Sequence, residues 1–150
     1  MKKLLIALLT LTLLFSCVPV ASAAADGEVI YHSQYCIDDD ITVVDEIIAY
    51  SQLRSQDKTY EFNRKITANG TTIGDISIKG TFRYDGTTVS VVSKSVTKKD
   101  TYDGWKYSQT SFTSSGGTIT LKAKLTKTLT PSISFTMTLS CDKDGNISYT

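Results

Sequence analysis

The chain has 150 residues, of which 41% are hydrophobic, and its 16 Lys and Arg nearly balance 15 Asp and Glu, for a net charge of +1. Lys2 and Lys3 precede an apolar run, so 14 bases (16 minus 2) face 15 acids from Asp26 onward, a net charge of −1. This balance argues against nucleic acid or an anionic membrane surface as a partner held by bulk charge.

Residues 1–25 have the pattern of a secretory signal peptide. The apolar stretch from Leu4 to Phe15 spans 12 residues, whereas a membrane-crossing helix needs about 20. Small residues from Ala21 to Ala25 supply two alternative cleavage sites. We expect a secreted protein. Alternatively, Leu14-Phe15-Ser16-Cys17 resembles a bacterial lipobox, in which Cys17 is lipidated and anchors the protein at the cell surface.

Two cysteines, Cys36 and Cys141, remain in the exported part of the chain. An even count in an oxidising compartment predicts one disulfide between them. Two buried free thiols are the alternative.

Residues 26–150 fit one domain, since no linker or low-complexity segment divides them. Alternation of apolar and polar residues with a period of two predicts strands with one solvent-exposed face and one buried face. It is clearest from Ile119 to Thr126 and from Ser132 to Cys141. The expected strands are 41–50, 58–68, 72–84, 87–98, 105–113, 118–127, 132–141 and 146–149.

Five dipeptides that tolerate positive φ lie between or beside these runs and predict hairpin turns. They are Asn69-Gly70, Asp85-Gly86, Asp103-Gly104, Gly116-Gly117 and Asp144-Gly145. Together with the alternation they predict an all-β fold, a single antiparallel β-sandwich of seven or eight strands. Gly80 shares the register of an apolar face and marks a bulge or a close approach. Residues 41–53 fit a strand or a short helix, and their Ile, Val, Thr and Tyr content favours the strand.

His32 is the only histidine, so every mechanism with a histidine base depends on it. No GxSxG motif accompanies it, and we expect His32 to lie on the surface without a catalytic role. The run Asp38-Asp39-Asp40 offers carboxylates to calcium, but a solvated loop is the simpler interpretation.

The acidic turn from Asp142 to Asn146 begins like an EF-hand loop. Its glycine stands fourth where the EF-hand needs it sixth, and the twelfth position has no Glu. We therefore expect a hairpin bend, and the sequence predicts neither a metal site nor a cofactor.

Three aromatic residues, Tyr102, Trp105 and Tyr107, flank the Asp103-Gly104 bend. Exposed at a loop tip, they would stack on sugar rings or anchor a protein interface. The alternative is that Trp105 and Tyr107 belong to the core.

The strands 118–130 and 132–141 also have the amphipathic texture of hairpins that β-pore-forming toxins insert into membranes. A strand of a soluble sheet has the same pattern, so pore formation is only a third hypothesis for function.

The segments FRYDGTTVSVVSKSV, YDGWKYSQTSFTSSGGTITLKAKLTK and SFTMTLSCDKDGNIS, within residues 80–148, resemble small secreted Ser/Thr-rich β-proteins of Gram-positive bacteria with no assigned activity. The resemblance implies a bacterial, extracytoplasmic protein and no particular site.

We therefore expect a non-enzymatic exported module that binds a protein or glycan through Tyr102, Trp105 and Tyr107. A small hydrolase with paired carboxylates is the alternative, because acids distant in sequence can converge in space.

Overall fold

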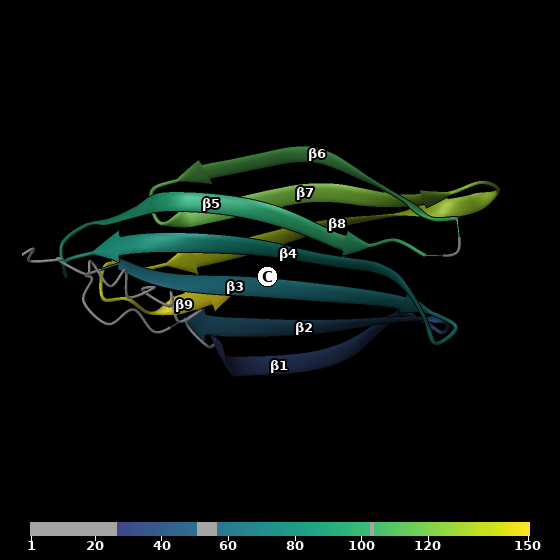
Figure 1. Cartoon of the computed structure of the whole chain (residues 1–150), viewed down its shortest axis with the longest axis horizontal. Coiled ribbons are helices and arrows are strands. Elements are labelled where there is room, and N and C mark those ends of the chain that lie inside the picture. The colour runs from purple at the N-terminus through teal and green to yellow at the C-terminus, as the bar shows by residue number, and fades with distance from the viewer. Residues whose placement is uncertain (1–26, 51–56, 103) are drawn as a thin grey trace, which may run out of the picture.

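The computed structural model describes residues 27–50, 57–102 and 104–150, without the side chains of 98–100, and shows two antiparallel β-sheets (Figure 1). The five-stranded sheet has the order β1-β2-β3-β4-β5, with β1 (Gly27–Asp38), β2 (Ile41–Tyr50), β3 (Asp57–Ala68), β4 (Thr71–Tyr84) and β5 (Val89–Asp100). The four-stranded sheet has the order β6-β7-β8-β9, with β6 (Lys106–Ser115), β7 (Thr118–Lys127), β8 (Thr130–Cys141) and β9 (Ile147–Tyr149). Within each sheet, strands that follow one another in sequence are neighbours.

The all-β prediction is confirmed, and each of the eight expected strands corresponds to an observed one. Residues 41–50 form β2, so this part of the ambiguous segment is a strand, while 51–53 lie outside the described residues. β1 was missed. It is exposed along almost its whole length, so its sequence lacks the alternation that burial of one face imposes on the other strands.

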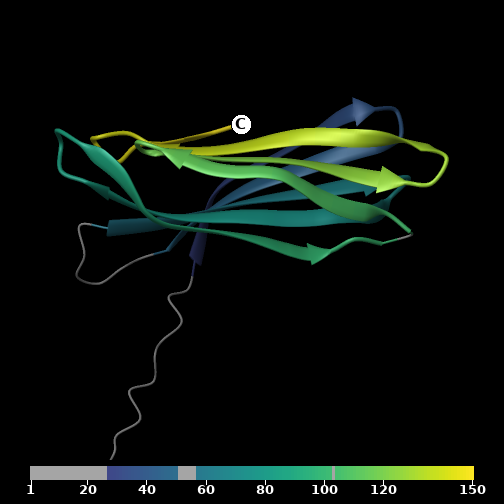
Figure 2. The ribbon, with the colours of Figure 1, turned by 90° about the horizontal axis from the view of Figure 1, so that it is seen from above.

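The inner faces of the two sheets share one large core (Figure 2). Phe62 and Ile78 of the five-stranded sheet and Leu121 of the four-stranded sheet are fully buried in the same cluster. Gly80 marks the predicted close approach: a Cβ there would collide with Ile119 from the facing sheet and also contact Phe82. Each of the five predicted turn dipeptides contains a glycine with positive φ: Gly70, Gly86, Gly104, Gly116 and Gly145.

One buried ion pair ties three strands together. Arg64 on β3 donates through Nε and Nη2 to both carboxylate oxygens of Asp45 on β2, at 2.8 and 2.7 Å. Its Nη1 donates to the backbone oxygen of Thr136 on β8, at 2.9 Å. Both side chains are more than nine-tenths buried, so either one alone would leave an uncompensated charge in the core.

The predicted disulfide between Cys36 and Cys141 is wrong: both thiols are free. Cys36 lies exposed on β1 and pairs with Thr42 of β2. Thr42 in turn pairs with Thr67, near the end of β3, so Cys36 lies level with that end. Cys141 is buried in the core cluster that contains Tyr60 of β3. Seven residues of an extended strand, about 23 Å, separate Tyr60 from Thr67, far beyond the span of a disulfide.

Candidate functional site

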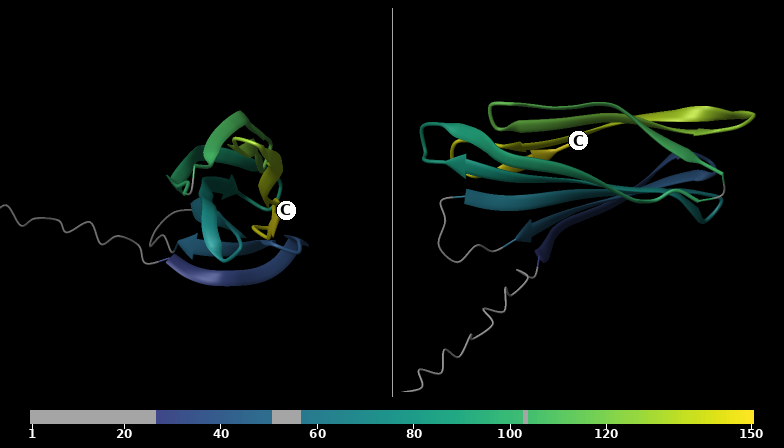
Figure 3. Two further views of the ribbon diagram at one scale, coloured as in Figure 1. Left: turned by 90° about the vertical axis from the view of Figure 1, so that its right-hand side faces the viewer. Right: turned by 45° about the horizontal axis from the view of Figure 1, so that its top comes forward.

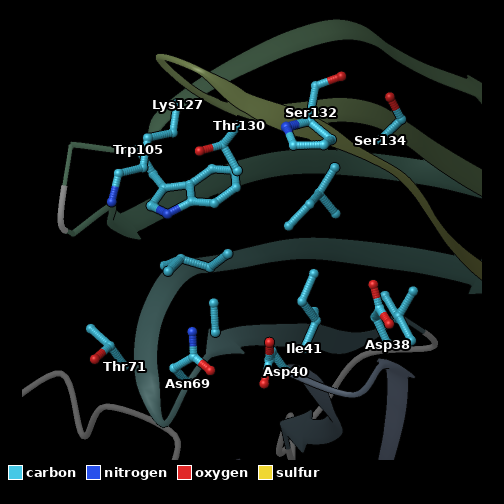
Figure 4. Close-up of a pocket in the computed structure, with 15 residues that line it drawn as sticks. Asp38, Asp40, Ile41, Asn69, Thr71, Trp105, Lys127, Thr130, Ser132 and Ser134 are labelled. Carbon is cyan, nitrogen blue, oxygen red and sulfur yellow. The ribbon is translucent and has the colours of Figure 1, made fainter.

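A pocket of about 720 Å³ opens between the two sheets at one end of the molecule (Figure 4). Its walls come from the β1–β2 turn, the β3–β4 turn, the residue before β6 and the β7–β8 turn with the start of β8. In each sheet successive strands run in opposite directions, so these turns gather at one end. The volume lies within the usual range for small-molecule sites.

Trp105 lines the pocket and stands immediately before β6. Its side chain packs in a second core cluster with Val43, Ile66 and Leu125, and the residue is 8% exposed. Its backbone N–H donates to the backbone oxygen of Tyr102 at 3.1 Å, which closes the bend before the strand. Among the described residues the indole N–H has no hydrogen-bond partner.

One wall of the pocket is acidic and polar. Asp38 and Asp40 come from the β1–β2 turn, and Asn69 and Thr71 from the β3–β4 turn. The backbone N–H of Asn69 donates to the backbone oxygen of Asp40 at 2.9 Å, so the two turns are held side by side. Asn69 has a φ of 49°, which the predicted Asn-Gly bend accommodates.

Among the described residues that line the pocket, the facing wall has no carboxylate. Lys127, Thr130, Pro131 and Ile133 line it, and Figure 4 shows Lys127 and Thr130 beside the indole, across the pocket from Asp40 and Asn69.

The free edge of β8 adds backbone hydrogen-bonding groups to this wall. Thr138 exchanges hydrogen bonds with Thr150 on the side away from β7, and the Thr136 oxygen accepts from Arg64 on that side. Because this direction repeats every second residue, the backbone N–H and C=O of Ser134 also point away from β7. Ser134 lines the pocket, so a ligand meets strand-edge donors and acceptors there.

The structure separates the three aromatic residues that were predicted to act together. Trp105 lines the pocket, Tyr102 is 48% exposed without lining it, and Tyr107 packs against both core clusters. Burial raises the pKa of the Tyr107 hydroxyl, and within the described residues this group has no hydrogen-bond partner. Tyr107 therefore belongs to the core, as the alternative interpretation held.

His32 lies on the exposed face of β1, where its Nδ1 is 3.1 Å from Oε1 of Glu46 on the neighbouring strand. This is an exposed cross-strand pair, outside the pocket. Nowhere in the described part of the chain do three or more His, Cys, Asp or Glu gather as a metal site would require.

The acidic turn after β8 is a hairpin bend, as expected. Oδ1 of Asp142 accepts the backbone N–H of Asp144 and of Asn146, at 2.9 and 2.8 Å, and Oδ2 accepts from the Asn146 amide at 2.8 Å. The Asn146 side chain and these N–H groups lower the pKa of the Asp142 carboxyl. The carboxylate is occupied by its own turn.

The predicted signal peptide, with Cys17, lies outside the described residues. Within the described ranges, 27–50, 57–102 and 104–150, there is no helix long and apolar enough to cross a membrane.

Comparison with known protein families, curated proteins and solved structures finds no match to this chain. The residues of the pocket therefore carry the functional argument by themselves.

Sequence reasoning found only part of this pocket. It singled out Trp105, the Asp38 run and the Asn69-Gly70 bend, but as separate features. It missed the β7–β8 turn, where Leu129 has a φ of 61° although no Gly or Asn marks the bend. The available signal was the alternating direction of consecutive strands, which places these turns at the same end.

Proposed function

We propose that the chain is an exported, non-enzymatic β-sandwich module that binds a glycan in the pocket between its sheets. The supporting observation is that the Trp105 indole lines the same pocket as two carboxylates, an amide and a hydroxyl, those of Asp38, Asp40, Asn69 and Thr71. Sugars present apolar C–H faces, which pack on aromatic rings, and a ring of hydroxyls. Carboxylate and amide oxygens accept hydrogen bonds from such hydroxyls, while the indole N–H and Lys127 donate.

The distribution of charge favours binding over hydrolysis. Asp38 and Asp40 stand on the same wall because one turn supplies both. Glycoside hydrolysis places two carboxylates on either side of the scissile bond, about 5 to 9.5 Å apart. Among the described residues, the facing wall with Lys127 and Thr130 has no carboxylate that would complete that arrangement.

Pore formation finds less support. On the apolar face of the β7–β8 hairpin, Leu121, Leu125 and Met137 are fully buried in the core between the sheets. Membrane insertion would first have to expose this core, at a large cost in burial.

Screening the protein expressed from the full chain on a glycan array, followed by titration, tests the proposal. Trp105 is the only tryptophan, so its fluorescence reports directly on the pocket. We expect Asp40→Asn to weaken binding about tenfold or more, because a charge-assisted hydrogen bond contributes about 1.5–3 kcal/mol.

Asp39→Asn is the matched control, because Asp39 belongs to the same turn but does not line the pocket. Its affinity should equal that of the unchanged protein. The proposal would be refuted if both variants lost affinity equally. It would also be refuted if no glycan on the array changed the fluorescence of Trp105 on binding.

A further inference from the structure

The strand β1 is an open edge of the five-stranded sheet. Among the described residues its only hydrogen-bonded neighbour is β2, and Figure 1 and Figure 3 show β1 at the outer margin of that sheet. Its 12 residues make it long for a strand, and no other described segment pairs with its backbone N–H and C=O groups on the side away from β2. A second strand could pair there.

This edge also concentrates exposed apolar surface. Of eight large hydrophobic residues that are exposed in the described part of the chain, five lie on β1: Val29, Ile30, Tyr31, Tyr35 and Ile37. Their exposure ranges from 39 to 55%. Exposed apolar groups clustered on one strand mark an interaction site rather than the usual scatter of single residues.

The common devices that protect edge strands are few here. Between Gly27 and Asp38 there is no Lys, Arg or Pro, the residues that usually block strand addition. Bulges occur only near the two ends, at Ile30 and Ile37. The six residues from Tyr31 to Cys36 keep an unbroken register with β2 and form a regular pairing edge.

The charge of this edge indicates which strand would pair. Residues 27–50 contain six acids and no Lys or Arg. Arg64 neutralises Asp45, and His32 contacts Glu46, which leaves the acids toward the two ends of β1, such as Glu28 and Asp38. If two copies of β1 paired antiparallel about Ser33, Glu28 would oppose Asp38 at both ends, and like charges in that position are destabilising.

We propose that β1 binds an extended cationic polypeptide segment, which adds as a sixth strand to the five-stranded sheet. Backbone hydrogen bonds to the Tyr31–Cys36 segment would hold the added strand, and its apolar side chains would cover Val29, Ile30 or Tyr35. Its Lys or Arg side chains would meet the acids at the ends of β1. The Tyr31–Cys36 segment lies outside the glycan pocket, whereas Ile37 and Asp38 at the end of β1 also line that pocket.

A labelled peptide tests this surface without knowledge of the natural partner. The probe is a fluorescein-labelled ten-residue peptide of alternating Val and Thr with three Lys, titrated into the protein by fluorescence anisotropy. We expect saturable binding that weakens as salt rises, because screening reduces the attraction between the charges. A twin peptide with Glu in place of Lys should bind at least tenfold more weakly; equal affinity would overturn the proposal.

Two lysine variants locate the binding. Ile30 and Val92 occupy bulges on the two opposite edges of the same sheet and are 49% and 48% exposed. Ile30→Lys should reduce the affinity for the Lys peptide at least tenfold, whereas Val92→Lys should leave it unchanged. Circular dichroism and the thermal midpoint verify that both variants fold. Binding that survives Ile30→Lys, or that both variants lose equally, would contradict β1 as the site.

Hydrogen exchange and sedimentation complete the test. Bound peptide should slow amide exchange in Tyr31–Cys36 without a change in Trp105 fluorescence, which separates this result from the glycan pocket. Protection confined to the pocket turns would overturn the proposal. A dimer of the protein alone that Ile30→Lys dissociates would also overturn it, because the occupant would then be a second copy.

Discussion

At the residue scale, single carboxylates decide the geometry of the turns. Asp142 accepts three hydrogen bonds from its own turn, and Asp85 accepts the backbone N–H of Thr87 and of Thr88, at 2.9 and 2.7 Å. These N–H groups lower the pKa of the Asp85 carboxyl. Asp142, which resembles a metal ligand in the sequence, therefore closes a chain reversal, as Asp85 does.

The Asp142 turn leads to a prediction about pH. Because the folded state lowers the pKa of this carboxyl, its contribution to stability is complete above the unfolded value of about 3.9 and is lost as pH falls through the folded value. Asp142→Ala should therefore lower the thermal midpoint at pH 7, and its difference from the unchanged protein should narrow below about pH 4. Thermal unfolding between pH 7 and pH 3 measures this.

Asp144→Ala is the control, because within the described part of the chain the Asp144 carboxylate accepts hydrogen bonds from the exposed Lys143 and from none of the turn's N–H groups. It should change the midpoint little. A difference for Asp142→Ala that stays constant down to pH 3 would contradict the assigned role.

At the element scale, the distance between the sheets depends on small residues in β4. Gly80 leaves room for Ile119 of β7, and Gly74 leaves room for Leu125 of the same strand. Glycine normally weakens a strand by about 0.5–1 kcal/mol relative to alanine. Here that cost is offset by the close packing of β4 against β7.

Gly80→Ala should therefore destabilise the fold, against the usual preference for alanine in a strand. Overpacking of a filled core costs about 1–3 kcal/mol, and urea unfolding measures it. Adding Ile119→Val, which removes one methylene group at the contact, should recover part of the loss. If the two substitutions were simply additive, or if Gly80→Ala were stabilising, the close approach would not limit the packing.

At the scale of the whole molecule, long strands keep the two cysteines apart. Cys36 is exposed at the end that carries the pocket turns, and Cys141 is buried toward the other end. Burial raises the pKa of the Cys141 thiol, so this thiol stays protonated and unreactive. The fold is therefore held by its core and its two sheets rather than by a disulfide.

Labelling with a thiol reagent distinguishes these environments. Cys36 should react in the native protein, and Cys141 only after denaturation. Cys36→Ser should leave the free energy of unfolding nearly unchanged, because Cys36 is exposed and forms no disulfide. If it did form one, the substitution would cost about 2–5 kcal/mol. Mass spectrometry of the non-reduced protein that found these two cysteines bridged would contradict the observed separation.

The local features of the fold were predictable because their signals lie within a few residues. Alternation places Leu121 and Met137 on inner faces, and Asn69-Gly70 marks a bend, whatever the rest of the chain does. The exposed β1 lacked such a signal, because neither of its faces is consistently buried.

The sequence by itself determined the class of fold, the positions of most strands and the character of the acidic turns, since backbone preference and one-sided burial are local properties. Only the tertiary structure decided that Asp45 pairs with Arg64, that Cys36 lies far from Cys141, and that Trp105 meets Asp40 across a pocket. These relations depend on the order and direction of strands in two sheets, which bring together residues that no short segment of the chain connects.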